Sequence, residues 1–175
     1  GTAEGLTLAL HVGAMLIAFL GLVYLINEGL EILSRPIMRF VYMPIAREHG
    51  LPEEEAINLK TLFAVVFVPF AFLLGVPLRD LPEVAQLLGT KTAFNEFLAY
   101  VELQQIRGAL SDRANTIAIY ALCGFANPGS LGIIIAGLTS LVPERRKEVV
   151  ELGLKSFVGG TLACFITACI AGMLI

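Results

Sequence analysis

The chain has 175 residues, of which 57% are hydrophobic and 15% charged, and its mean hydropathy is +0.80. Soluble globular domains carry about 25% charged residues, so the composition excludes an ordinary water-soluble domain. The formal net charge is −3, and the basic residues do not cluster with aromatic ones. Nucleic acid is therefore not a predicted partner.

About half of the chain lies in four stretches that contain no Asp, Glu, Lys or Arg. A membrane-spanning helix needs about 20 mostly apolar residues, so three of the stretches are long enough and the second is marginal. The four stretches are Gly5–Asn27, Thr61–Leu78, Ala114–Pro143 and Ser156–Ile175. The sequence therefore predicts an all-α, polytopic protein of the lipid bilayer.

Residues 1–34 are predicted to form a long, tilted transmembrane helix, because the apolar run exceeds what a perpendicular crossing requires. His11 in this helix either relays protons or forms a hydrogen bond with a neighbouring helix. The run is too long for a cleavable signal peptide, and Gly1 stands where an initiating Met is expected, which suggests a piece of a longer polypeptide.

Residues 35–79 are predicted to form a loop and an interfacial helix. Pro36 and two further prolines are expected to break any long helix at the start of this region. The apolar run that follows is rich in Phe and has Pro69 in its interior. It is expected to lie at the membrane interface or to re-enter, and not to span.

Residues 80–112 are predicted to form a re-entrant helical hairpin. Two short segments, Leu81–Leu88 and Phe97–Ile106, flank a polar tip, and neither is long enough to cross a bilayer alone. The backbone of such a tip is tolerated at membrane depth only where protein or a water-filled cavity covers it.

Residues 113–143 are predicted to form a discontinuous transmembrane helix. Several helix breakers interrupt the run, among them Gly124 and the Asn127-Pro128 pair, so that Cys123–Ser130 is expected to be a non-helical link between two half-helices. Transporters use such half-helix ends to bind substrates near the bilayer midplane. The alternative is a kinked helix that serves only packing.

Residues 144–175 are predicted to form a basic loop and the last transmembrane helix. The loop and the residues after it carry Arg145, Arg146, Lys147 and Lys155. The positive-inside bias therefore favours a cytoplasmic loop and a C-terminus on the outer side of the plasma (inner) membrane. Small residues recur every four positions along the last helix and suit close helix packing. They are Gly159, Ala163, Thr167 and Ala171.

The three cysteines, Cys123, Cys164 and Cys169, lie within apolar runs and lack the spacing of metal ligands. We interpret them as small buried apolar residues. No group of Ser, His and Asp stands at catalytic spacing. The sequence therefore predicts neither a metal site nor an enzyme.

Two groups of motifs occur in the second half of the chain. The first is Gly89-Thr90-Lys91, Asn95-Glu96-Phe97 and Ala99-Tyr100, and the second is Cys123-Gly124-Phe125-Ala126-Asn127 and Gly129-Ser130-Leu131-Gly132. Together they resemble the C-terminal half of the concentrative nucleoside transporters. The long first helix is similar to that family's oblique helix, so the resemblance covers nearly the whole chain.

This resemblance implies that a hairpin and a discontinuous helix from each of two inverted repeats hold one nucleoside. Asn95 and Glu96 would then lie at the hairpin tip, with Glu96 accepting hydrogen bonds from the ribose. Asn127 and Ser130 would bind the ribose from the other side, and Phe125 would pack against the base. The resemblance also implies a homotrimer and an N-terminal half, absent from this chain, that contains the sodium site.

The predicted function is cation-coupled symport of nucleosides, driven by sodium or protons and without a cofactor, in which this chain contacts the ribose. The alternative is a structural or regulatory membrane module. Glu96 likewise has an alternative role, an ion pair with Lys91 or with a cation of an adjacent protomer. Tyr100 is expected to be a wall of the hairpin, because it stands four residues after Glu96.

Overall fold

The computed structural model describes residues 1–44, 47, 56–124 and 126–175, and all regular structure within these ranges is helical. The helices are α1 (Thr2–Ile37), α3 (Leu59–Leu73), α4 (Leu81–Ala93), α5 (Glu96–Ile106), α6 (Asp112–Leu122), α7 (Pro128–Leu141) and α8 (Arg146–Met173). Short helical turns cover Met38–Tyr42, Leu78–Asp80 and Pro143–Arg145. The all-α prediction is confirmed for the described residues.

Within the described ranges, two helical stretches are long and apolar enough to cross a membrane, Gly5–Tyr42 and Pro143–Met173. In the most apolar windows of these stretches, only 6% and 17% of the residues are buried within the chain. Such bare apolar surface is what a helix facing lipid or another protein segment presents. The apolar helices α3 and α7 have 15 and 14 residues and are shorter than a perpendicular crossing needs.

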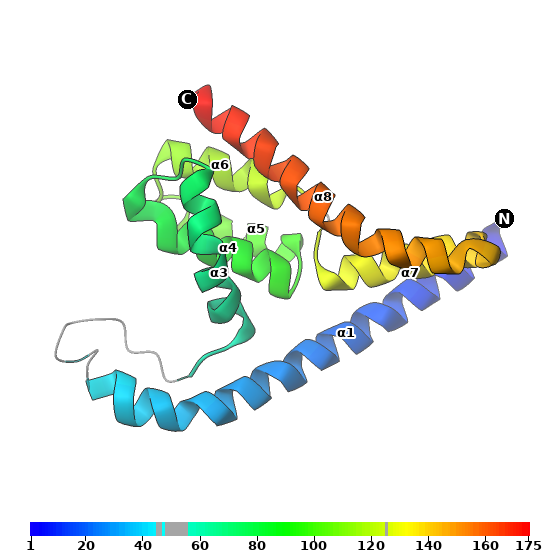
Figure 1. Cartoon of the computed structure of the whole chain (residues 1–175), viewed down its shortest axis with the longest axis horizontal. Coiled ribbons are helices and arrows are strands. Elements are labelled where there is room, and N and C mark those ends of the chain that lie inside the picture. Colours follow the sequence, from blue (N-terminus) through cyan, green and yellow to red (C-terminus); the bar gives the residue numbers. More distant parts are fainter. Residues whose placement is uncertain (45–46, 48–55, 125) are drawn as a thin grey trace.

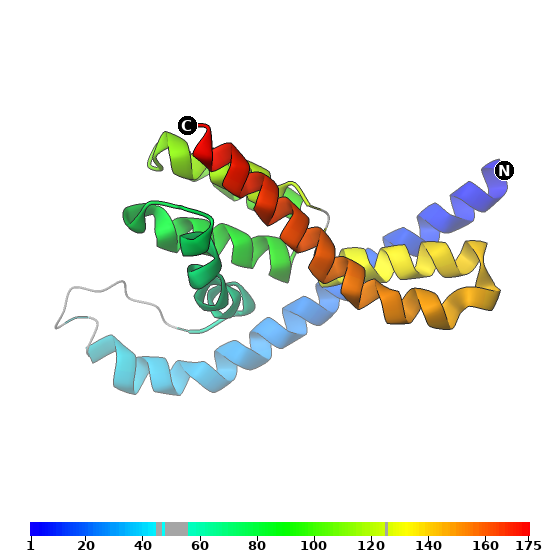
Figure 2. The same cartoon turned by 45° about the horizontal axis from the view of Figure 1, so that its top comes forward.

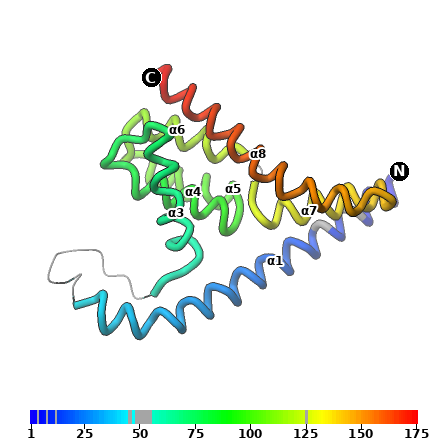
Figure 3. The backbone as a smooth tube through the Cα atoms, viewed as in Figure 1, coloured from blue at the N-terminus to red at the C-terminus, as the bar shows by residue number. Residues whose placement is uncertain are grey.

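The helices form two regions (Figures 1 and 2). The packed unit consists of α3–α6 and the second half of α8, which lies against α6. The arm consists of α1, α7 and the first half of α8, with α7 in contact with both of the others. Figure 3 follows the chain from the N-terminus in the arm to the C-terminus beside the packed unit.

The hydrophobic core lies in the packed unit. Its largest fully buried apolar side chains are Val84, Leu87, Leu88, Ile117 and Leu122. Gly89 brings α4 against α3, because a Cβ atom there would lie 2.8 Å from the carbonyl oxygen of Lys60 and 2.9 Å from the amide nitrogen of Ala64. Only glycine permits this backbone contact.

The expected helix break at Pro36 was wrong. The proline lies inside α1, and the helix passes directly into the π-helical turn Met38–Tyr42, which the N–H of Met43 closes onto the carbonyl of Met38. A proline removes one i→i−4 hydrogen bond, and a wider turn beside it allows the chain to remain helical. The loop therefore begins later than residue 35.

The hairpin tip and the link of the broken helix are both shorter than predicted. Helix α4 continues through Gly89 to Ala93, so only Phe94 and Asn95 separate it from α5. Helix α6 ends at Leu122 and α7 begins at Pro128, so the described residues of the link are Cys123, Gly124, Ala126 and Asn127. Proline suits the first helical position, where its missing N–H costs no hydrogen bond, so it starts this half-helix.

The last helix also begins earlier than expected, because Arg146 and the two residues after it are helical and not part of a loop. The small residues Gly159, Ala163 and Thr167 remain exposed. The buried residues of α8 are Gly153, Phe165, Ala168 and Gly172. The predicted small-residue stripe therefore does not form a packing face within this chain.

Candidate functional site

The turn between α4 and α5 places two of the predicted site residues in different roles. Asn95 has extended backbone and caps α5, its side-chain oxygen accepting a hydrogen bond from the N–H of Leu98 at 2.9 Å. Asparagine is a preferred N-cap because it satisfies one of the free N–H groups of the first turn. Glu96 is the first residue of α5 and is half-buried. A carboxylate is favourable there because the helix N-terminus carries partial positive charge.

The link between α6 and α7 ends with a second asparagine cap. Asn127 is 2% exposed, has extended backbone, and accepts a hydrogen bond from the N–H of Ser130 at 2.8 Å. Its cap uses the side-chain oxygen, so the side-chain amide nitrogen is available for a different partner.

That partner is Glu96. The side-chain nitrogen of Asn127 donates a hydrogen bond to the carboxylate oxygen Oε2 of Glu96 at 3.2 Å. The two residues are separated by 31 positions, and the contact joins the first turn of α5 to the first turn of α7. Two helix N-termini and one carboxylate therefore meet at the seam between the packed unit and the arm.

The C-terminus of α6 is capped by two side chains of the hairpin. The ammonium of Lys91, which is 2% exposed, donates to the carbonyl of Ala121 at 2.9 Å. The hydroxyl of Tyr100 donates to the carbonyl of Ile119 at 2.7 Å. The last carbonyls of a helix lack intrahelical partners, and these two bonds satisfy them. Tyr100 thus joins α5 to α6, which agrees with its expected place as a wall.

The alternative ion pair of Lys91 with Glu96 is not formed. The ion pairs between described residues are Arg35–Glu31, Lys60–Glu102, Arg79–Asp80 and Arg145–Glu148. Glu96 takes part in none of them, and its one described side-chain hydrogen bond comes from Asn127. The carboxylate accordingly keeps lone pairs for further donors.

The link runs through a narrow space between α4 and α8. A Cβ atom at Gly124 would overlap the sulfur of Cys164 and would lie 3.4 Å from the ammonium nitrogen of Lys91. The backbone of the link can pass there only because residue 124 has no side chain. Cys164 is thus a wall of the link and is partly buried.

The remaining predicted site residues occupy different positions. Ser130 is 3% exposed and lies in the first turn of α7, where its N–H is bound by Asn127. Phe125 lies outside the described residues. His11 is exposed on α1 and lines a cavity of about 760 Å³ that also touches Ser140 and Leu141 at the end of α7.

Sequence reasoning missed a polar network beside the site. Glu102 on α5 accepts hydrogen bonds from the ammonium of Lys60 and from the hydroxyl of Thr90, each at 2.9 Å. The network connects α3, α4 and α5, and each residue is separated by more than ten positions from the next. Polar residues at positions 60, 90 and 102 in short apolar helices could have indicated a buried polar network. Which of these residues form hydrogen bonds with each other depends on how the helices cross, and the sequence does not give this.

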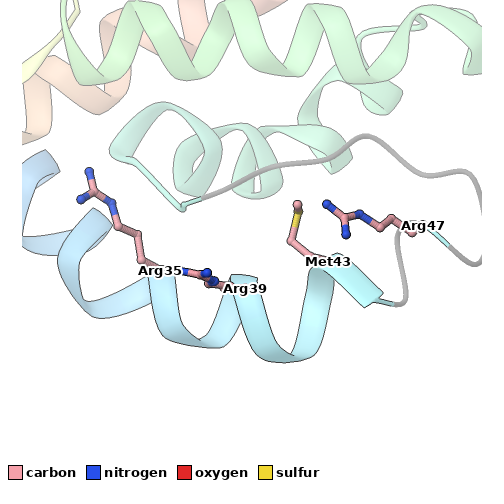
Figure 4. A pocket seen from close by; sticks show the side chains of 4 residues that line it. All are labelled: Arg35, Arg39, Met43 and Arg47. Atoms are coloured by element: carbon pink, nitrogen blue, oxygen red, sulfur yellow. The ribbon is translucent and has the colours of Figure 1, made fainter.

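Another cavity, of about 510 Å³, lies at the far end of α1 and is lined by Arg35, Arg39, Met43 and Arg47 (Figure 4). These four lining residues stand four positions apart, and three of them are arginines. They come from none of the elements that form the Glu96–Asn127 contact. Among the described residues, no three His, Cys, Asp or Glu side chains are grouped to hold a metal ion.

These features define an all-helical protein that has two helices long and apolar enough to cross a membrane and a carboxylate and an amide paired at a helix break. Residues 1–172 match the family described as "Na+ dependent nucleoside transporter C-terminus". The chain is 36% identical to solute carrier family 28 member 3 of Rattus norvegicus, over 99% of this chain and 25% of that protein. It is 38% identical to nucleoside permease NupC of Helicobacter pylori, over all of this chain and 40% of that protein.

The chain is also similar in structure to a solved transporter. A variant of the transporter CNTnw in an intermediate state is 33% identical, superimposes with a TM-score of 0.76, and aligns over 98% of this chain and 40% of that one. The chain belongs to the concentrative nucleoside transporter family and corresponds to its C-terminal domain. It is an integral membrane protein of a transporter family and not an enzyme. It spans 25% to 40% of the lengths of these relatives.

Proposed function

We propose that this chain is the C-terminal half of a cation-coupled nucleoside symporter and that it binds the ribose of the substrate. The observation that carries the proposal is the 3.2 Å contact between Asn127 and Glu96, which joins the hairpin turn to the helix break. Discontinuous helices of transporters direct their free ends toward the substrate, and here two such ends carry a carboxylate and an amide.

The chemistry of Glu96 supports a polyol as the ligand. A carboxylate near mid-membrane costs about 2.5–3.5 kcal/mol on insertion scales, while a hydrogen bond to a charged group contributes about 1.5–3 kcal/mol. One bond from Asn127 therefore barely offsets the cost of placing the carboxylate there. Two neighbouring hydroxyls of a ribose are a suitable pair of further donors, because an ionised carboxylate accepts at both oxygens.

The other site residues have different roles in this proposal. Asn127 fixes the carboxylate and contacts the ribose, and the hydroxyl of Ser130 lies one helical turn further along α7. Asn95 shapes the hairpin turn, since its side-chain oxygen is already bound to the N–H of Leu98. Phe125 is the proposed contact for the base.

The membrane arrangement is part of the same proposal. Helices α4 and α5 form a re-entrant hairpin, and an inverted repeat in the N-terminal half supplies a matching hairpin and the sodium site. Three such transporters assemble as a homotrimer. The name of one relative, sodium/nucleoside cotransporter 1 of Mus musculus, which is 35% identical, supports sodium as a coupling ion. Uptake measured under a sodium gradient and under a proton gradient separates the two candidate ions.

Thermal unfolding of the purified full-length transporter tests the substrate class. Uridine and adenosine at about 100 times their dissociation constants should raise the free energy of unfolding by about 2.7 kcal/mol. The free bases uracil and adenine serve as controls that lack the ribose. A structural or regulatory module, the alternative function, would show no shift with any nucleoside.

The proposed topology places the C-terminus and Ser111 outside and Arg146 in the cytoplasm. Single cysteines at position 112, an exposed site next to Ser111, and at position 146 report the two sides, in a background in which the native cysteines are replaced. A membrane-impermeant thiol reagent applied to intact cells should label position 112 and spare position 146. The reverse pattern would overturn the topology and leave the substrate class untouched.

A further inference from the structure

Lys91 has a role that the proposed ribose site does not assign. It is 2% exposed, in the last turn of α4, and its one described hydrogen bond goes to the carbonyl of Ala121 at 2.9 Å. A buried ammonium is costly unless it is bound to acceptors. The structure must therefore gain something from the contact between this cation and α6.

The acceptor lies at a helix C-terminus. Ala121 is the penultimate residue of α6, and the carbonyls of the last turn have no intrahelical partner. The same end carries partial negative charge from the helix dipole, which favours a cation. Tyr100 from α5 donates to the carbonyl of Ile119, two residues before Ala121, so both helices of the hairpin hold this one helix end.

The contact lies close to the ribose site along both chain segments. Lys91 stands five residues before Glu96, and Ala121 stands six residues before Asn127. The Lys91–Ala121 bond and the Glu96–Asn127 bond therefore connect the same two segments at two successive points. A shift of the α6 end relative to the hairpin would change the separation of the carboxylate and the amide.

Lys91 also lies close to the link that carries Asn127. Between the two bonds the link passes Gly124, where a Cβ atom would lie 3.4 Å from the nitrogen of Lys91. The ammonium thus lies beside the backbone that leads to Asn127, with room for no side chain between them. No described residue of the arm competes for it by an ion pair.

We propose that Lys91 is a positioning residue for nucleoside binding, which caps the C-terminus of α6 and thereby holds Asn127 opposite Glu96 without touching the substrate. This inference rests on the proposed function, because it assigns Lys91 to the same site. It predicts that the effect of Lys91 on affinity passes through Asn127.

The test is a double-mutant cycle in the full-length transporter, with the dissociation constant for uridine or adenosine as the readout. Lys91→Met keeps the length of the side chain and removes its charge and its donor. It should weaken binding about 10-fold, or about 1.4 kcal/mol. In an Asn127→Ala background the same change should weaken binding less than about 2-fold. Lys155→Met, on the exposed side of α8, is the control and should bind as the wild type does.

The results that would overturn the positioning role of Lys91 are as follows. Wild-type affinity in folded Lys91→Met, or an equal loss in both backgrounds, overturns the positioning role. Lys91→Met removes a costly buried charge and leaves only the carbonyl of Ala121 without this donor, so the variant is expected to fold. If Lys91→Met does not accumulate, Lys91→Gln, which keeps an N–H donor, replaces it in the cycle. Failure of both variants to fold would show that Lys91 is needed for folding and would overturn the proposal. A wild-type transporter that binds no nucleoside would instead refute the proposed function.

Discussion

The packed unit and the arm are both built from helices but are stabilised differently. In the packed unit, large side chains such as Leu87 and Ile117 are fully buried against one another. In the arm, helices meet where a glycine lies under a side chain of the neighbouring helix, as at Gly132, where a Cβ would lie 2.9 Å from the methyl group of Met15. Most of the apolar side chains of α1 remain exposed, including Leu25 at 68%.

The difference shows that only one of the two regions has a core of its own. The packed unit gains stability from burial within the chain, whereas the arm depends on lipid or on other segments of the transporter to cover it. The proposed ribose site lies at the seam, with Glu96 supplied by the packed unit and Asn127 by the N-cap of α7. Matched substitutions in the two regions therefore test whether only the packed unit has a core of its own.

The largest effect is expected for truncation in the core. Leu87 is 1% exposed, and Leu87→Ala should lower the free energy of unfolding by about 3–5 kcal/mol, because it removes buried methyl groups and leaves a cavity. The matched variant Leu25→Ala in the arm should change it by less than about 0.5 kcal/mol. Denaturant unfolding of the full-length transporter in detergent measures both. Equal losses would show that the arm is as tightly packed as the core.

Glu96→Gln probes the seam. The substitution keeps the size of the side chain and removes its charge, so nucleoside affinity should fall about 5- to 150-fold, or about 1–3 kcal/mol, while the amount of folded protein hardly changes. Binding of ribose-intact and 2′-deoxy nucleosides to the folded protein measures the loss, which should be smaller for the deoxy compounds.

A structural role for Glu96 gives a different pattern. If the carboxylate paired with a buried cation of another segment, its loss would destabilise the fold by about 3–5 kcal/mol, and affinity per folded transporter would not change. Unchanged affinity for every nucleoside in well-folded Glu96→Gln would rule out the binding role.

A smaller effect is expected for the cap of α6. The hydroxyl of Ser111 accepts from the N–H of Ala114 at 3.2 Å and donates to the buried carboxylate of Asp80 at 2.5 Å. Ser111→Ala should lower the free energy of unfolding by about 1–2 kcal/mol. Ser140→Ala is the control, because this exposed serine in the arm binds only the carbonyl of Gly137 in its own helix. A similar loss at both positions would contradict the comparison.

The smallest effect is expected at Gly21 on α1, where no atom lies within 4 Å of an added Cβ. Gly21→Ala should change the free energy of unfolding of the full-length transporter by less than about 1 kcal/mol in either direction. Gly89→Ala should lower it by more, because the added atom would meet the backbone of α3. A large loss at Gly21 would reveal a helix of the complete transporter packed on this face.

The sequence predicted the contact between Glu96 and Asn127 better than the bounds of the helices that carry it. Charge-free runs and clustered breakers indicated helices and a broken helix, and motif similarity predicted that Glu96 and Asn127 would meet. The bounds were less accurate because helix ends depend on tertiary contacts. Gly89, for instance, is a breaker in isolation, yet it lies within α4, where its lack of a side chain lets α3 pack closely.

Long-range side-chain pairs were the least predictable part. Lys91 was expected to be a possible partner of Glu96, five residues away, and not of a carbonyl 30 positions further along the chain. The bond to Ala121 exists because α4 and α6 end near each other, which no local pattern encodes. The same reason explains why the pairing of Lys60 with Glu102 was not foreseen.

The narrow passage at Gly124 has a consequence for how variation in α8 reaches the substrate. Because the sulfur of Cys164 occupies the space where a side chain at 124 would stand, any larger group at position 164 would press on the link itself. A bulky residue or a bulky thiol adduct there should displace Asn127 and weaken nucleoside binding from a helix that carries none of the proposed ribose contacts. Residue 164 is thus restricted to small side chains, because the backbone of the link between α6 and α7 occupies the adjacent space.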